Sequence, residues 1–487
     1  MGDNYVTRRR ALSALGVAGF AGLAGCGEES GPGDDGNGNG NGNGNGNGNG
    51  NGNGNGNGNG NGNGTPGTRT LQDVSGTIKI GVLQPLTGDL QYYGQLGVWG
   101  FLSGLAYKGD TDPPADVSAG TVEMDVGDVT YELLLRDTEF AADIAQTRAT
   151  DLVQSENVDM LFGCSSSGAA TRVVNTVVSQ TNVPYMAGPA ASADLTSNSE
   201  TCNEIVFRAS ENTAMDARSG GQYVAQETDV QDVYLFGADY SFGRAVVNNY
   251  QQVLEANGVN VIDTRFVEQG YSDWGPLLDN AEEAGADGIV GGFTVATLPQ
   301  LFTAFLSGDY SYRAFGGFAT LITNTVVGET MQNALGQDLT AQDIRDAKLG
   351  PFTTRYHWNQ YDNEINDSFV QSHIDTYGVV PDLFSSGTFT AASAIHQGAR
   401  LSGSLDGADI ADELRGMTVR ETPKGENAYT FQTYNNQARS EMTVADPVPT
   451  SDEWADTWSA PIMPGEPLVR ISGEDTTIPA SDMSCSL

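Results

Sequence analysis

Three consecutive serines at positions 165–167 follow a short apolar segment and precede a helix-like pattern that begins near Ala169. Two kinds of chemistry place serines in such a turn. A hydrolase presents one serine as a nucleophile on a sharp turn between a strand and a helix. A binding protein instead directs hydroxyls and free backbone N–H groups at the positive end of a helix toward an anion.

The spacing of the glycines and the supply of histidines both disfavour a hydrolase. A nucleophile turn has the pattern Gly-x-Ser-x-Gly, whereas the segment from Gly163 to Gly168 is one residue too long. A serine nucleophile also needs a general base, and the chain has three histidines, two of them in helical patterns: His357, His373 and His396. No metal-ligand spacing or phosphate loop is present. We therefore expect no catalytic residue, metal or cofactor, with a secreted serine hydrolase as a remote alternative.

A second turn, at residues 187–195, repeats the arrangement of small and hydroxyl residues after the next predicted strand. Either turn alone is equally consistent with a simple helix cap. Parallel strands present their carboxyl ends at one edge of a sheet, so the two turns together offer converging donors. The pair predicts a binding site for a small anion, most simply a carboxylate.

The elements that position these turns follow from the apolar pattern. From Gly76 onward, short apolar runs rich in β-branched residues alternate with helical patterns, which predicts parallel βαβ units. The alternation restarts after residue 210, so we expect an α/β fold with two doubly wound, Rossmann-like lobes. The acidic segment from Asp446 onward is expected to be irregular.

The charge balance points to a protein that works in strong salt. The chain has 62 acidic and 23 basic residues among 487, giving a formal net charge of −39, and only four of the basic residues are lysines. At an ionic strength of 1 M the Debye length is about 3 Å, so the self-repulsion of such a surface is screened. The sequence contains no basic patch, and we expect no nucleic-acid partner.

The N-terminal segment reads as an export signal and an anchor. Residues 1–26 combine a twin-arginine pattern at Arg8 and Arg9 with an apolar stretch too short to span a membrane comfortably. The stretch ends at Leu23-Ala-Gly-Cys26, which resembles a lipobox and predicts lipidation of Cys26. Residues 27–75 include fourteen Asn-Gly repeats, typical of a flexible tether that reaches roughly 30 Å. We expect an exported protein anchored to the outer face of the cell membrane.

An exported location permits one disulfide among Cys164, Cys202 and Cys485, and the spacing does not say which pair forms. The sequence also leaves open whether Asn366, in an Asn-Asp-Ser sequence, is glycosylated.

Several motifs in order along residues 76–445 resemble the leucine/isoleucine/valine-binding (branched-chain amino acid) family of periplasmic solute-binding proteins of ABC importers, here in a haloarchaeal lipoprotein form. The motifs lie at 80–88, 93–94, 164–167, 189–192, 206–208, 239–243 and 423–425. The resemblance implies a type I periplasmic binding protein fold, with two lobes joined by three hinge crossovers. It implies that lobe 1 comprises 76–209 and 352–420 and lobe 2 comprises 210–351 and 421–487. The crossovers are expected near 208–210, 350–352 and 421–423.

The resemblance also implies the residues of the site. In the family, the serine after the cysteine and the hydroxyl of the second turn hold the α-carboxylate and ammonium of an amino acid. The ligand-binding residues implied here are Ser165, Ser166, Ala190, Ser192, Tyr93, Phe242, Phe293 and Phe318.

One departure affects the solute. Amino-acid binders of the family carry a glutamate for the ammonium where this chain has Gly316-Gly317-Phe318. A buried ammonium without a counter-charge is costly. Either Asp239 or another acid replaces the glutamate, or the solute is a carboxylate that lacks an amine. The family's disulfide partner for the cysteine of the first turn is also missing from residues 137–140.

The resemblance implies a solute-binding lipoprotein that captures an amino acid (branched-chain type) or a similar small carboxylate and delivers it to ABC permease subunits. A ligand-sensing receptor module of the same fold, binding amides or organic acids, is the alternative.

Overall fold

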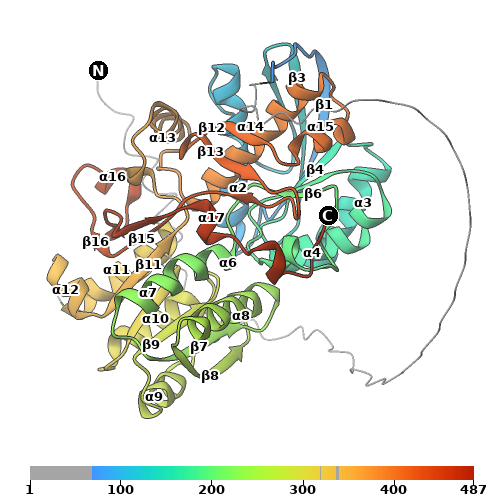
Figure 1. Ribbon diagram of the computed structural model, residues 1–487. Coiled ribbons are helices and arrows are strands. Elements are labelled where there is room, and N and C mark those ends of the chain that lie inside the picture. The colour runs from blue at the N-terminus through green and yellow to red at the C-terminus, as the bar shows by residue number, and fades with distance from the viewer. Residues whose placement is uncertain (1–68, 318–319, 336–338) are drawn as a thin grey trace, which may run out of the picture. The chain divides into compact units, whose positions relative to one another are not determined.

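Two β-sheets organise the described part of the chain (Figure 1). The computed structural model describes residues 69–317, 320–335 and 339–487. The predicted signal, Cys26 and all but the end of the tether lie outside the described residues. Within those ranges, no helix is both long and apolar enough to cross a membrane.

The first sheet has six strands in the order β2-β3-β1-β4-β5-β6, all parallel except β2, which is antiparallel to β3. Its strands are β1 (Gly76–Gln84), β2 (Gly120–Val126), β3 (Val129–Asp137), β4 (Met160–Gly163), β5 (Tyr185–Ala187) and β6 (Val206–Arg208). The helices between them are α2 (Gln91–Gly109), α3 (Ala142–Gln154), α4 (Ser167–Thr176), η1 (Val178–Gln180) and α5 (Asp194–Ser197).

The second sheet has seven strands in the order β18-β15-β11-β10-β9-β7-β8. Its strands are β7 (Asp232–Ala238), β8 (Asn260–Val267), β9 (Gly288–Gly292), β10 (Arg313–Gly317), β11 (Leu349–Thr354), β15 (Met442–Ala445) and β18 (Val469–Ile471). Its helices are α6 (Thr213–Asp216), the π-helix η2 (Ala217–Gly221), α7 (Gln222–Glu227), α8 (Ser241–Ala256), α9 (Gly275–Glu283), α10 (Leu298–Ser307), α11 (Leu321–Leu335) and α12 (Ala341–Asp346).

The remaining elements lie between or beyond these strands. They are η3 (Trp358–Gln360), α13 (Glu364–Tyr377), α14 (Leu383–Ser402), α15 (Gly407–Leu414), β12 (Thr418–Thr422), β13 (Gly425–Phe431), β14 (Ala438–Arg439), β16 (Pro447–Pro449), α16 (Ala455–Trp458), β17 (Ile462–Pro464), α17 (Gly473–Thr476) and η4 (Ala480–Asp482).

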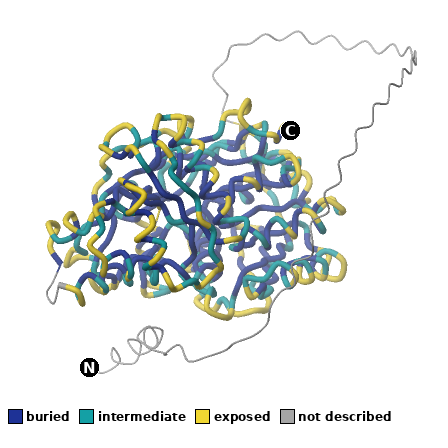
Figure 2. Tube along the Cα trace, turned by 90° about the horizontal axis from the view of Figure 1, so that it is seen from below, coloured by how far each residue is buried: buried dark blue, intermediate teal, exposed yellow. Residues whose placement is uncertain are grey.

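Each sheet is apolar on both faces, as a parallel sheet covered by helices requires. In the first sheet, Ile80 and Leu133 share a buried cluster with α2 and α14, whereas Leu134 shares another with α3 and α4. In the second, Phe236 packs with residues of α9 and α10, and Leu235 packs with residues of α8. Figure 2 shows the buried residues through the interior and the exposed residues around the rim. The expected α/β fold with two doubly wound lobes is confirmed.

Helices α2 and α14 approach closely because glycines line their contact. A Cβ added to Gly100 would lie 2.1 Å from the carbonyl oxygen of Ser385, and one at Gly104 would lie 2.6 Å from that of Phe389. The hydroxyl of Ser385 donates to the carbonyl of Leu96 over 3.1 Å. This contact attaches α14 to the first lobe, as expected for the segment after the second crossover.

Two of the three crossovers lie at other positions than the sequence suggested. The first follows β6, as expected, but residues 350–352 lie inside β11 of the second sheet. Residues 421–423 lie in the hairpin of β12 and β13, whose Tyr429 and Phe431 join the core of the first lobe. The chain therefore crosses after β11 and again between β14 and β15. Residues 352–354 therefore belong to lobe 2 and residues 421–439 to lobe 1. The boundary depends on which core buries the apolar side chains, and short sequence motifs do not contain that information.

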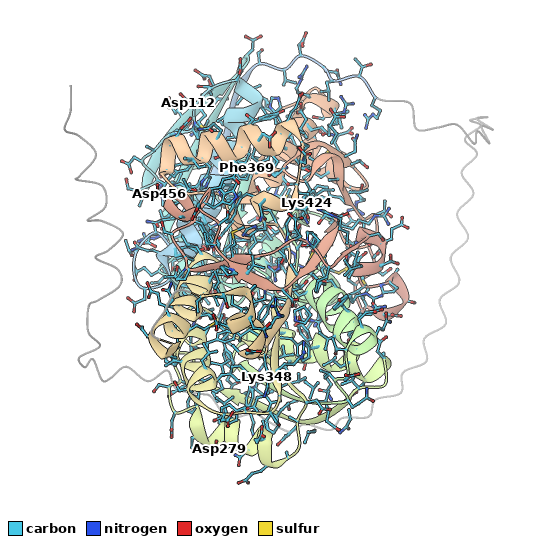
Figure 3. All side chains as sticks on the ribbon, turned by 90° about the vertical axis from the view of Figure 1, so that its left-hand side faces the viewer. Asp112, Asp279, Lys348, Phe369, Lys424 and Asp456 are labelled. Carbon is cyan, nitrogen blue, oxygen red and sulfur yellow. A yellow bond between two sulfur atoms is a disulfide. The ribbon has the colours of Figure 1, made fainter. Side chains whose placement is uncertain are left out.

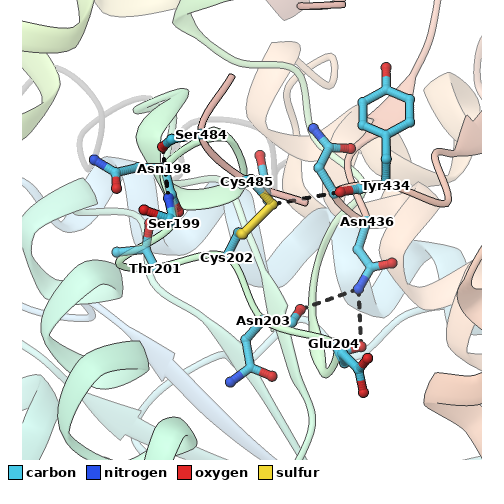
Figure 4. The surroundings of a disulfide bond; sticks show 12 residues. Asn198, Ser199, Thr201, Cys202, Asn203, Glu204, Tyr434, Asn436, Ser484 and Cys485 are labelled. Carbon is cyan, nitrogen blue, oxygen red and sulfur yellow. Dashed lines mark hydrogen bonds between the residues drawn. A yellow bond between two sulfur atoms is a disulfide. The ribbon is translucent and has the colours of Figure 1, made fainter. Parts of the chain in front are cut away.

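The acidic tail also differs from expectation, because β16 and β17 pair with each other and β18 extends the second sheet beside β15. Beyond β18, the chain returns to the first lobe. There Cys485 forms a disulfide with Cys202, with the two Cα atoms 5.9 Å apart (Figure 4). The backbone N–H of Cys485 also donates to the carbonyl of Ser197 over 3.0 Å. Because β18 belongs to the second sheet and Cys202 to the first lobe, the tail forms a covalent fourth connection between the lobes. The remaining cysteine of the described residues, Cys164, is free and buried.

We expect the variant Cys485→Ser to be less stable than the wild type by about 2–4 kcal/mol, because the disulfide constrains the unfolded chain. Thermal unfolding in concentrated salt measures the loss. Dithiothreitol should lower the melting temperature of the wild type and leave that of the variant unchanged. Equal sensitivity of both proteins to the reductant would contradict this assignment of the disulfide.

Candidate functional site

A cavity lies where the carboxyl ends of both sheets face each other, which is the usual ligand position in such sheets. Its volume is about 910 Å³, including space that is open to solvent. The first lobe and α14 contribute Tyr93, Phe140, Ser165, Ser167, Pro189, Ala191, Leu383 and Phe384. The second lobe contributes Asp216, Tyr240, Phe242, Val246, Tyr250, Val290, Gly291, Gly292, Phe293, Thr294, Leu298, Gly317, Thr320, Thr323, Thr353 and Arg355.

The hydroxyls of the first serine turn have different partners. Ser165 follows β4 and lines the cavity; its Oγ lies 2.6 Å from Oε1 of Gln84 and 3.1 Å from the carbonyl oxygen of Tyr93. Ser166 is the N-cap of α4, and its hydroxyl accepts from the backbone N–H of Ala169 over 3.3 Å. Ser166 therefore stabilises the end of the helix, whereas Ser165 lines the cavity.

Gln84 and Ser167 join the two turns. The Gln84 amide accepts from Ser165 and donates to the carbonyl of Gly188 over 2.6 Å. The hydroxyl of Ser167 accepts from the backbone N–H of Ser192 over 3.1 Å. The turns are therefore adjacent, as the parallel arrangement of β4 and β5 required.

A buried arginine holds the second turn from behind. Nη1 of Arg208 donates to the carbonyl of Ala190 over 3.0 Å and to that of Ser192 over 2.6 Å. The Ala190 carbonyl, expected to accept from an ammonium, thus already accepts from a guanidinium. The Ser192 hydroxyl lies 3.4 Å from Oδ2 of Asp194, and its residue is 1% exposed.

The predicted residues therefore separate into three groups. Ser165, Tyr93, Phe242 and Phe293 line the cavity. Ser166, Ala190 and Ser192 are buried behind it and are not among the lining residues, whereas Ser167 and Ala191 take those places. Residues of both turns line the cavity, but the orientation of each residue in a turn depends on helix capping and on Arg208. Phe318 lies outside the described residues.

Tyr93 connects the two lobes across the cavity. Its ring packs edge-on against Phe384, with ring centroids 5.0 Å apart, and lies 5.9 Å from the ring of Phe140. Its hydroxyl accepts from the backbone N–H of Val295, in the loop after β9, over 2.9 Å. Burial raises the pKa of Tyr93, so the hydroxyl stays neutral.

Aromatic side chains of the second lobe form the opposite wall. The rings of Tyr240 and Phe242 lie 6.2 Å apart. Phe293 packs edge-on against Trp274, with centroids 5.2 Å apart, and is 4% exposed. Phe293 therefore belongs to the hydrophobic core of the lobe and also lines the cavity.

The charged pair of the cavity was not predicted from the sequence. Nε of Arg355 donates to Oδ1 of Asp216 over 2.9 Å, and Nη2 donates to Oδ2. Their side chains are 10% and 11% exposed. Arg355 directly follows β11, so the rule that ligands bind beyond strand ends could have identified it.

The acid that the sequence suggested as a replacement for the missing glutamate lies elsewhere. Asp239 forms a salt bridge with Arg244, and both side chains are 54% exposed. Asp239 is not among the cavity residues. Exposed pairs of this kind contribute little to binding or stability.

None of the three histidines is bonded to the serine turn. Nδ1–H of His357 donates to Oδ1 of Asn359, and Nδ1–H of His373 donates to the carbonyl of Val379 over 2.8 Å. His396 lies 2.9 Å from the hydroxyl of Tyr131. In the described ranges, no three His, Cys, Asp or Glu side chains are grouped to hold a metal ion.

The asparagine whose glycosylation the sequence left open is buried. Asn366 is 2% exposed, and its Nδ2 donates to the carbonyls of Trp358 and Tyr361 over 2.8 Å each. The side chain is therefore a structural contact of the loop before α13.

A buried ion pair lies where the chain crosses between the lobes. Nζ of Lys424, labelled in Figure 3, lies 2.8 Å from Oε1 of Glu211. Tyr429 and Ser440 donate their hydroxyls to the same oxygen over 2.6 and 2.8 Å. Burial alone would raise the pKa of Glu211, but attraction to Lys424 and these hydrogen bonds lower it below its ordinary value. The pair links the first crossover, at Glu211, to the last, at Ser440.

Comparison with known sequences gives one family. A family model described as periplasmic binding protein matches residues 77–451. No curated protein sequence matches the chain.

Solved structures share the fold at low sequence identity. An ABC-type branched-chain amino acid transporter from Rhodopseudomonas palustris matches with a TM-score of 0.62 and 21% identity, over 83% of this chain and 99% of its own. A leucine binding protein from Thermotoga maritima has a TM-score of 0.63 and 18% identity, over 82% and 99%. An ABC-transporter solute binding protein from Rhodopseudomonas palustris, in complex with 4-hydroxybenzoate, has a TM-score of 0.64 and 17% identity, over 82% and 97%. At these identities the similarity establishes the fold, which is the expected type I periplasmic binding protein fold.

Glu211 predicts a specific sensitivity to acid. Because the folded state lowers its pKa from 4.5, its contribution to stability is complete above about pH 4.5 and decreases as the pH falls through the folded-state pKa. Glu211→Gln leaves Lys424 buried without a counter-charge and should cost about 3–5 kcal/mol at neutral pH. Denaturant unfolding as a function of pH measures both effects.

The control is the double variant Glu211→Gln/Lys424→Met, which removes both charges. It should recover part of the stability lost by the single variant and show a smaller loss below pH 4.5 than the wild type. A double variant with the acid sensitivity of the wild type would contradict this role of the pair.

Proposed function

Because the chain belongs to the periplasmic binding protein family, we propose that it is the extracellular solute-binding protein of an ABC importer. The observation that carries the proposal is the cavity formed by the strand ends of both lobes. Its hydroxyls, aromatic walls and single arginine suit a solute with a small anionic group and an apolar body. The lobes are joined by chain crossovers and by Tyr93, so a solute between them would contact both.

The proposed solute is an amino acid of the branched-chain type or a similar small carboxylate. Ser165 lines the cavity at the end of β4, next to the N-terminus of α4, where anions are favoured. Its hydroxyl donates to Gln84 and would turn to the solute on binding. The structural relatives named above include proteins described with branched-chain amino acids, leucine and 4-hydroxybenzoate. Both amino acids and simple carboxylates are therefore reasonable solutes for the first binding panel.

We further propose that the protein is a haloarchaeal lipoprotein. The support is the twin-arginine pattern, the lipobox ending at Cys26, the Asn-Gly tether and the net charge of −39. A lipid anchor on a flexible tether would keep the binding domain close to its permease subunits while leaving it free to rotate.

The anchor predicts where the protein is found. Wild-type protein should sediment with membranes after cell breakage in high salt, whereas Cys26→Ser should appear in the growth medium or the soluble fraction. Immunoblots of the fractions measure this distribution, with Cys164→Ser as the control for loss of an unrelated cysteine. Membrane retention of the Cys26→Ser protein would exclude lipidation as its anchor.

The serine turn predicts a difference between two neighbouring residues. Ser165→Ala removes a hydroxyl that faces the cavity and should weaken solute binding by about 1–3 kcal/mol. Ser166→Ala removes the cap of α4 and should lower stability by about 1 kcal/mol while leaving affinity nearly unchanged. Calorimetric titration in concentrated KCl, against panels of amino acids and organic acids, measures affinity.

The wild type should give a saturable one-site isotherm with at least one solute. Equal affinities of the two variants would contradict the role of Ser165. Lack of binding across both panels would contradict the proposed function.

A further inference from the structure

The charges around the cavity are few and already matched. Asp216 and Arg355 are the only acidic and basic side chains among the described lining residues. The neighbouring residues outside the description, Phe318 and Ala319, carry no charge by sequence. A solute therefore meets one carboxylate and one guanidinium, which already pair with each other.

The geometry of this pair neutralises the carboxylate and leaves a guanidinium N–H group outside the two hydrogen bonds. Both carboxylate oxygens of Asp216 accept from Arg355, through Nε and Nη2. The Asp216–Arg355 hydrogen bonds do not use Nη1, and Arg355 lines the cavity. The same salt bridge fixes the guanidinium plane, because a two-point contact allows one orientation. The pair thus presents Nη1 in a preorganised position.

Other nearby acids are also engaged. Asp382 precedes the cavity residue Leu383, accepts from the hydroxyl of Tyr92 over 2.5 Å, and caps α14 through the backbone N–H of Phe384. Glu211 pairs with Lys424 and does not line the cavity. A solute ammonium at the remaining lone pairs of Asp216 would lie beside the Arg355 guanidinium, whose like charge repels it.

The two possible head groups therefore differ sharply. A carboxylate accepting from Nη1 forms a charge-assisted hydrogen bond and leaves the Asp216–Arg355 pair intact. An ammonium meets a carboxylate that Arg355 already neutralises and a guanidinium that repels it, or it displaces Arg355 from Asp216, and both are unfavourable. The other described lining residues are aromatic, aliphatic, glycine or hydroxyl residues, and offer an ammonium no negative charge.

Resting on the proposed function, we propose that Arg355, oriented by Asp216, is the residue that selects the charge of the solute. It binds the anionic group from the second lobe, and the site takes a small carboxylate with an apolar body and no ammonium. The aromatic walls from Tyr93 and Phe384 on one side and Phe242 and Phe293 on the other hold that body.

Matched pairs of solutes that differ in the ammonium test the proposal. The probes are 4-methylpentanoate against L-leucine and 3-phenylpropanoate against L-phenylalanine, titrated calorimetrically into the full-length protein at constant KCl concentration. The wild type should bind at least one deaminated acid ten-fold or more tighter than its amino acid.

Three variants separate selection from folding. Arg355→Gln should weaken binding of the acid at least ten-fold. Asp216→Asn keeps the size of the side chain but removes its charge, and should maintain or increase affinity for the acid. Arg355→Gln/Asp216→Asn contains no buried charge at the site, should remain folded by circular dichroism, and should lose the preference for the deaminated acid.

The outcomes distinguish this inference from the function on which it rests. Tighter binding of the amino acids, with loss of that binding in Asp216→Asn, would make Asp216 an ammonium site and overturn the inference while supporting the receptor. Acid binding unchanged in Arg355→Gln would overturn the role of Arg355 alone. Failure of all four probes and of both solute panels would overturn the proposed function itself.

Discussion

The buried guanidinium of Arg208 is the contact on which the geometry of the cavity depends. Besides the carbonyls of Ala190 and Ser192, it bonds Thr196 at 2.7 Å and Gln437 at 2.6 Å. Burial lowers its pKa to about 9, which still leaves it charged near neutral pH. One side chain thus ties the second turn to the end of β6 and to the segment that crosses to the second sheet.

A consistent division follows between residues that build the site and residues that face it. In each turn one residue stabilises the turn itself. Ser166 caps α4, and the backbone of Ser192 donates to Ser167 and accepts from Arg208. The neighbours Ser165 and Ala191 line the cavity. Rigid turns behind a cavity reduce the reorganisation that binding would otherwise require, so these buried contacts support recognition without touching the solute.

The sequence predicted the parts of this structure that depend on local pattern. Alternating apolar runs give both lobes, and the turns at 164–167 and 189–192 lie at the cavity as their place after strands requires. Asp216 and Arg355, by contrast, are 139 residues apart and meet only when the second lobe folds. Contacts between residues far apart in the sequence also decide which lobe contains β12 and β13. The same is true of the pairing of Cys202 with Cys485. Local periodicity carries no signal for such contacts.

A crystal structure of the protein, grown in high salt with a saturating deaminated carboxylate, would show directly whether Arg355 binds the anionic group of the solute. We expect solute density in the cavity, with the carboxylate within hydrogen-bonding distance of Nη1 of Arg355 and the Asp216–Arg355 pair intact. Solute bound elsewhere on the protein, or a carboxylate in the cavity turned away from Arg355, would contradict it.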